Sequence, residues 1–147
     1  MGADLSRFDL VVGSDVPRTA ETAIAFGCSV DDEIVYSDPT IDTGIDFHAW
    51  WQWDGPFVEI ARIIDENGAA RGVASTIADA WTALARQLPE QGRALAVSHG
   101  GVMELGLVGC LPGVDQATWG QPFSHCEGFE LLFDRDRFVE VSFLRFR

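Results

Sequence analysis

Two short stretches of this sequence combine residue types and spacing that suit the binding of an anion. The first is Ser98-His99-Gly100-Gly101, which follows an apolar run that predicts a buried strand and precedes a predicted helix. A strand that ends where a helix begins presents free backbone N–H groups and the positive end of a helix dipole. We therefore expect His99 and the N–H group of Gly100 to bind a phosphate, and His99 to act as a general acid or base. The alternative is a core histidine that is hydrogen-bonded to backbone.

The second stretch surrounds Arg18. The run Asp9–Ser14 predicts a short buried strand, and Pro17 suits the first turn of a helix that continues to Phe26. Ser14 and Arg18 therefore lie at a second strand-to-helix junction. Arg18 can bind a phosphate with two N–H groups, and its charge opposes the helix dipole unless an anion lies nearby. The alternative is a surface arginine without a ligand.

The rest of the chain supplies elements that position these two junctions. Strands alternating with helices predict a three-layer α/β/α domain with a mostly parallel sheet, in which ligands bind at the carboxyl ends of the strands. The length of 147 residues and the lack of an internal boundary predict one domain over residues 1–147. Further predicted elements are a strand at Glu33–Tyr36, helices at Phe57–Glu66 and Val73–Leu88, and a C-terminal antiparallel hairpin formed by Gly128–Phe133 and Arg137–Phe146.

A loop predicted over Ser37–Pro56 contains the run His48-Ala49-Trp50-Trp51-Gln52-Trp53. Three tryptophans in four residues cannot all face one core. Trp50 and Trp53 form the wall of a ligand pocket in one interpretation. In the other, the tryptophans pack a long loop against the domain.

Composition excludes several classes of partner. The net charge is −13 and lysine is absent, so nucleic acids and anionic membranes are repelled. No apolar run is long enough for a membrane span, and the N-terminus lacks the pattern of a signal peptide. Cys28, Cys110 and Cys126 form no Cys-x-x-Cys pair, so we expect three buried free thiols and a cytoplasmic setting. No cluster has the spacing of metal ligands, so no metal is expected.

The two stretches resemble the signatures of a known family. The spacing Ser14-x-x-x-Arg18-x-x-x-Thr22-Ala23, followed by Ser98-His99-Gly100-Gly101 after a strand, is similar to that of the histidine phosphatase superfamily, the phosphoglycerate-mutase-like proteins. The resemblance implies that family's fold and a phosphate pocket lined by Arg18 and His99, with no metal or other cofactor. It also implies a proton-donating carboxylate in the loop after the third family strand, where Asp42 is the best match.

The chain departs from the family at its nucleophile. The family begins with a strand that ends in Arg-His-Gly, whose histidine carries the phosphoryl group, and no Arg-His-Gly occurs here. His48 and His125 could replace that histidine only in a rearranged fold. We therefore expect an N-terminally shortened domain with a partial phosphate pocket, which binds a phosphorylated or anionic small molecule without phosphohistidine chemistry. The alternatives are a phosphatase or mutase whose nucleophile segment lies upstream, and a non-catalytic interaction module.

The absent strand leads to a structural expectation. In the resemblance it would lie inside the sheet, between the Asp9–Ser14 strand and the C-terminal hairpin. Unpaired buried backbone groups are costly, so we expect either the hairpin to pair with the Asp9–Ser14 strand or a second copy of the chain to fill the gap as a homodimer.

Overall fold

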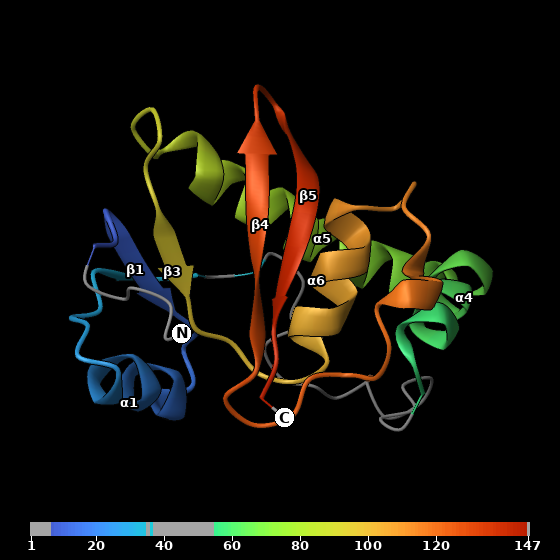
Figure 1. Ribbon diagram of the computed structural model, residues 1–147, viewed down its shortest axis with the longest axis horizontal. Helices are drawn as coiled ribbons and strands as arrows, with labels where there is room; N and C mark the ends of the chain where they lie inside the picture. The colour runs from blue at the N-terminus through green and yellow to red at the C-terminus, as the bar shows by residue number, and fades with distance from the viewer. Residues whose placement is uncertain (1–6, 35, 37–54, 147) are drawn as a thin grey trace.

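A computed structural model describes residues 7–34, 36 and 55–146 of the chain. Within this part the chain alternates strands and helices before it ends in a hairpin (Figure 1). The elements are β1 (Leu10–Gly13), α1 (Pro17–Ala25), β2 (Asp32–Glu33), α4 (Phe57–Glu66), α5 (Gly68–Arg86), β3 (Ala94–Ala96), α6 (Val102–Cys110), the 3₁₀ helix η1 (Gln116–Thr118), β4 (Gly128–Asp134) and β5 (Arg137–Leu144).

The strands form two separate sheets. β1 lies in the middle of a three-stranded parallel sheet with the order β2-β1-β3, and β4 pairs only with β5, antiparallel. Figure 1 shows β1 and β3 side by side over α1, with the hairpin between this sheet and helices α4 and α6. The prediction of an α/β fold with a parallel sheet and a C-terminal antiparallel hairpin is therefore confirmed.

The expected pairing of the hairpin with the Asp9–Ser14 strand is wrong. β1 is hydrogen-bonded to β2 on one side and to β3 on the other, so it has no free edge to offer the hairpin. The open edges among the described strands include those of β3 and β4 that face away from their partners. A homodimer that uses these edges stays a prediction.

Two strands differ from their predicted form. Of the strand expected at Glu33–Tyr36, the structure shows the two-residue β2, since Asp32 and Glu33 are the residues of this segment, as far as it is described, that have register partners in β1. β3 is shorter than expected and only partly buried. Among the described strands, β3 is an edge strand whose one neighbour is β1, so it is less covered than a central strand.

The helices follow local signals closely. α4 spans the residues predicted from its apolar face, with Phe57, Ile60 and Ile64 buried. α5 starts before the predicted Val73, because the Asn67 side chain accepts hydrogen bonds from the N–H groups of Ala69 at 2.9 Å and Ala70 at 3.2 Å. This N-cap satisfies two donors that the first helical turn leaves without partners.

We expect Asn67→Ala to lower the free energy of unfolding by about 1 kcal/mol, because both capping bonds are lost. Urea unfolding followed by tryptophan fluorescence measures the change. Asn67→Asp is the matched control, since a carboxylate oxygen keeps the cap, and it should stay close to the wild-type value. Equal losses in both variants would mean that the cap does not stabilise α5.

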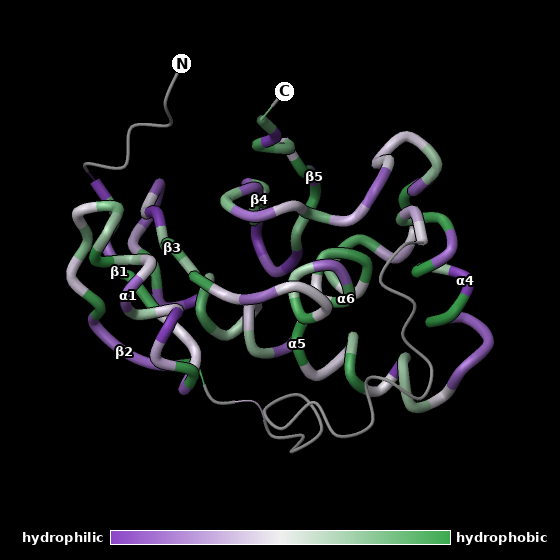
Figure 2. Tube along the Cα trace, turned by 90° about the horizontal axis from the view of Figure 1, so that it is seen from below, coloured by the Kyte–Doolittle hydropathy of each residue, from purple (hydrophilic) through white to green (hydrophobic). Residues whose placement is uncertain are grey.

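The main core lies between α4, α5, α6 and the hairpin, where the apolar faces of these elements meet (Figure 2). The apolar face of α5 supplies the buried side chains Val73, Ile77 and Trp81. Helices α5 and α6 pack closely because Gly109 has no side chain: a Cβ atom there would lie 2.5 Å from the carbonyl oxygen of Ala74. This core fixes the position of α6, whose N-terminus follows His99.

The three cysteines are free thiols. Cys28 and Cys110 are partly buried, whereas Cys126 is exposed, so the expectation of three buried thiols is wrong for Cys126. Cys126 lies in the loop before β4, where its φ of 64° is in the left-handed region. A search of the described helices for one with the length and hydropathy of a membrane span finds none.

Candidate functional site

The register of β1 and β3 brings the two predicted junctions to one edge of the sheet. Val12 lies opposite Ala96, and the N–H of Val97 donates to the carbonyl of Val12 at 2.9 Å. Both strands run in the same direction, so their carboxyl ends point to the same side. The residues that follow them, Ser14 and Arg18 on one strand and His99 on the other, therefore share this edge.

At the first junction, Ser14 and Thr19 close the turn between β1 and α1. Ser14 is buried, its N–H donates to Thr19 Oγ1 at 3.0 Å, and its hydroxyl accepts from the N–H of Val16 at 3.2 Å. The Thr19 hydroxyl in turn donates to the carbonyl of Val16 at 2.8 Å. The Ser14 hydroxyl thus has a structural role here, and its role as a phosphate ligand stays a prediction.

Arg18 is the side chain of this junction that is available to a ligand. It lies in the first turn of α1 and is exposed to solvent. Among the ion pairs of the described residues, none includes Arg18. A guanidinium at the positive end of a helix, outside the ion pairs of the described residues, suits an external anion.

At the second junction, the turn from β3 into α6 presents several hydrogen-bond donors. His99 is partly exposed and Gly100 is exposed, and in the described part of the chain their N–H groups have no acceptor. Gly101 adopts φ at 87°, a conformation that favours glycine, and so reverses the chain into the helix. The predicted anion-binding groups at His99 and Gly100 are therefore present on an accessible turn.

The structure adds Ser98, which the motif alone does not single out as a ligand. Its hydroxyl oxygen is buried and has no hydrogen-bond partner among the described residues. A buried hydroxyl without a partner is costly, so this group favours an additional polar partner beside His99. No sequence signal distinguishes it from an ordinary strand serine, because its burial depends on the packing around β3.

The structure also adds Glu104, in the first turn of α6. It is 1% exposed, yet it is a carboxylate. One oxygen accepts from the N–H of Gly101 at 2.7 Å, and the other accepts from the N–H of Phe123 at 3.0 Å. Glu104 therefore joins the turn after His99 to a loop that is distant in the sequence.

Several predicted site residues are not part of the described geometry. Asp42, His48, Trp50 and Trp53 lie outside the described residues, so their predicted roles stay predictions. His125 is exposed in the loop that leads to β4. The predicted pocket therefore consists, in the described part of the chain, of groups from the two junctions alone.

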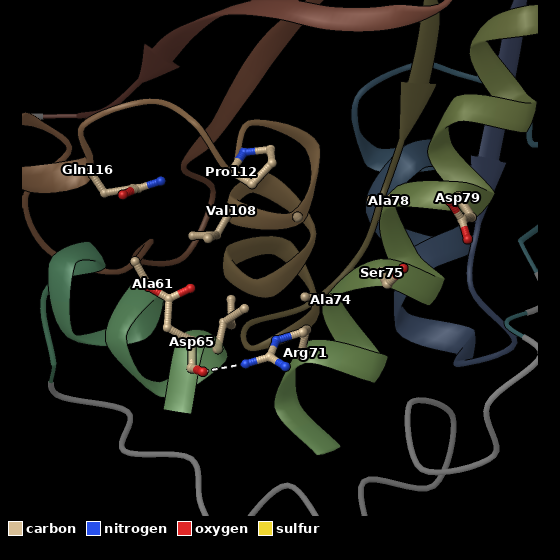
Figure 3. Close-up of a pocket in the computed structure, with 12 residues that line it drawn as sticks. Ala61, Asp65, Arg71, Ala74, Ser75, Ala78, Asp79, Val108, Pro112 and Gln116 are labelled. Carbon is tan, nitrogen blue, oxygen red and sulfur yellow. Dashed lines mark hydrogen bonds between the residues drawn. The ribbon is translucent and has the colours of Figure 1, made fainter. Parts of the chain in front are cut away.

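The hollow drawn in Figure 3 lies elsewhere, between α4, α5 and α6. It has a volume of about 230 Å³, and its polar side chains include Asp65, Ser75 and Asp79. The guanidinium of Arg71 donates to the carbonyl of Asp65 at its rim (Figure 3). It includes none of the predicted anion-binding residues, so we do not assign the site to it.

Comparison with family models, curated proteins and solved structures finds no match for this chain. A search of the described residues for three or more His, Cys, Asp or Glu side chains able to hold one metal ion also finds none.

Proposed function

We propose that this chain binds a phosphorylated or otherwise anionic small molecule at the carboxyl edge of β1 and β3. The observation that supports the proposal is the register of the two parallel strands, which brings Arg18 and His99 to the same edge of the sheet. Ligands of open α/β sheets bind at the carboxyl ends of strands. The proposed domain is a relative of the phosphoglycerate-mutase-like histidine phosphatases with a three-layer arrangement, and its free thiols favour the cytoplasm.

Each group at the edge has a distinct task. Arg18 supplies a positive charge and a planar pair of N–H donors, which match two phosphate oxygens. The free N–H groups of His99 and Gly100 bind a third oxygen, aided by the dipole of α6. The His99 imidazole donates or accepts a proton. We propose binding without phosphohistidine chemistry, because the sequence contains no Arg-His-Gly nucleophile motif.

We expect Arg18→Ala and His99→Ala each to raise the dissociation constant for inorganic phosphate about 10- to 100-fold, because each removes a hydrogen bond to a charged group. Titration of labelled protein with phosphate, followed by amide NMR, measures the constant and identifies the amides that shift. The His99 and Gly100 amides should be among them.

The chain offers matched controls for both substitutions. Arg137→Ala removes an exposed arginine from the start of β5, and His125→Ala removes an exposed histidine, so both should bind phosphate within about twofold of wild type. The proposed site would be contradicted if only the two control variants lost phosphate affinity, or if none of the four variants did.

An assay with an aryl phosphate tests the catalytic half of the proposal. We expect no turnover above that of the His99→Ala variant. Robust turnover that His99→Ala abolishes would favour the alternative of an active phosphatase.

A further inference from the structure

We infer that Glu104 is a positioning residue for the anion site, which holds the His99–Gly101 turn against the loop in front of β4. The inference rests on the proposed function, because it concerns the same turn. Glu104 itself does not contact the ligand. It acts by fixing the backbone that carries the N–H donors.

The Glu104 carboxylate is buried and hydrogen-bonded. Glu104 is 1% exposed, and each of its two oxygens accepts one backbone N–H, from Gly101 at 2.7 Å and from Phe123 at 3.0 Å. A buried charge is retained only where hydrogen bonds compensate its lost hydration. The N-terminus of α6 adds a favourable dipole. The two bonds are therefore strong and set the position of both donors.

One hydrogen bond joins the N–H of Gly101 to the Glu104 carboxylate. Gly101 is the residue before α6, and its positive φ of 87° reverses the chain into the helix. The carboxylate fixes this N–H and with it the peptide unit that joins Gly100 to Gly101. The neighbouring N–H groups of His99 and Gly100, which have no acceptor among the described residues, are thereby held in a defined orientation.

The other hydrogen bond joins Glu104 to Phe123, whose side chain packs against several neighbours. Phe123 stacks on Phe129 at a ring distance of 5.3 Å and meets the edge of Phe57 at 5.6 Å. Arg145 lies over the Phe123 ring at 5.0 Å and donates to the carbonyls of Trp119 at 3.0 Å and Gln121 at 2.6 Å. The loop is thus fixed to the core and to the end of β5, so Glu104 connects the His99 turn to a rigid part of the protein.

Positioning and simple charge make opposite predictions for Glu104→Gln. The substitution removes a negative charge near the site, which by electrostatics alone would tighten the binding of phosphate. Glutamine has one acceptor oxygen and one NH₂ group, so one of the two backbone N–H groups would face a donor and lose its hydrogen bond. We expect the positioning effect to be larger, so that the dissociation constant for inorganic phosphate rises about three- to tenfold.

The experiment compares Glu104→Gln with Glu130→Gln, which removes an exposed carboxylate from β4 and should leave phosphate affinity within about twofold. Amide spectra without phosphate should show shifted Gly101 and Phe123 signals in Glu104→Gln alone. Phosphate affinity that is unchanged or tighter in a folded Glu104→Gln variant overturns the inference. If Arg18→Ala also fails to weaken binding, the proposed function fails; if Arg18→Ala does weaken it, only the positioning role fails.

A second variant tests the same connection if Glu104→Gln does not fold. Arg145→Lys keeps the net charge and leaves Glu104 in place, but it loses the planar group that binds several carbonyls of the loop. We expect about two- to threefold weaker phosphate binding with an unchanged amide spectrum in α5. Unchanged affinity in Arg145→Lys overturns the inference.

Discussion

Phe57→Ala should lower the free energy of unfolding by about 3–5 kcal/mol, a large part of the roughly 5–15 kcal/mol that is typical of a domain. Phe57 is the first residue of α4 and is 0% exposed. Its ring meets Trp119 at 5.4 Å, Phe123 at 5.6 Å and Phe143 at 6.2 Å, all near edge-to-face. The substitution leaves a cavity where α4, the loop after η1 and β5 meet.

The measurement is urea unfolding followed by fluorescence, with Val58→Ala as the neighbouring control. Val58 is 47% exposed on the same turn of α4, so its truncation should change stability by less than about 0.5 kcal/mol. Equal destabilisation by both substitutions would contradict the aromatic cluster as the source of the loss, because alanine favours a helix more than phenylalanine or valine does. Because the N–H of Phe123 also donates to Glu104, Phe57→Ala should additionally shift the Gly101 amide.

Local patterns in the sequence predict much of this fold. The apolar spacing of α4 and the stripe on α5 each define a buried face within one helix, so no distant contact is needed to recognise them. The alternation in β4 and β5 is equally local, and a short Asp-Arg-Asp turn connects them. The start of α5 is missed only because Asn67 serves as the C-cap of α4 and the N-cap of α5 at once.

The order of the strands cannot be predicted in the same way. β1 pairs with β3 across most of the chain, and no local pattern in either strand indicates which strand will lie beside it. The incorrect expectation for the hairpin arises here, since alternation shows that two strands pair but not what lies beside them. The partial exposure of β3 likewise follows from its place at an edge.

The same distinction between local and distant interactions applies to the residues of the candidate site. Arg18 and His99 are recognisable because their junctions have local motifs. Glu104 and Ser98 are not, because one depends on a hydrogen bond to a residue 19 positions away and the other on the burial of a single oxygen. Residues that belong to a local motif are thus recognisable from sequence, whereas a group defined by its burial or by a distant hydrogen bond requires the fold.

Cys110 in the folded protein should react with iodoacetamide about a thousandfold more slowly than the same thiol in the unfolded chain. Burial, assisted by the negative charge of Asp79, raises the pKa of the Cys110 thiol from 9.0 to about 12. Only the thiolate reacts, and below the pKa each unit lowers the thiolate fraction tenfold. Mass spectrometry after timed labelling at pH 8, with and without urea, measures both rates.

The exposed Cys126 provides the control within the same molecule, since its labelling rate should be similar in the folded and unfolded chain. The raised pKa also gives a sign for stability. Below pH 9 the Cys110 thiol is protonated in both the folded and the unfolded chain, and its full contribution to stability is present. Between pH 9 and 12 this thiol loses its proton in the unfolded chain but keeps it in the folded protein, so the free energy of unfolding falls as pH rises. Equal labelling of Cys110 and Cys126 in the folded protein would contradict the burial of Cys110 at the end of α6, and with it the packing that positions the His99 turn at the other end of that helix.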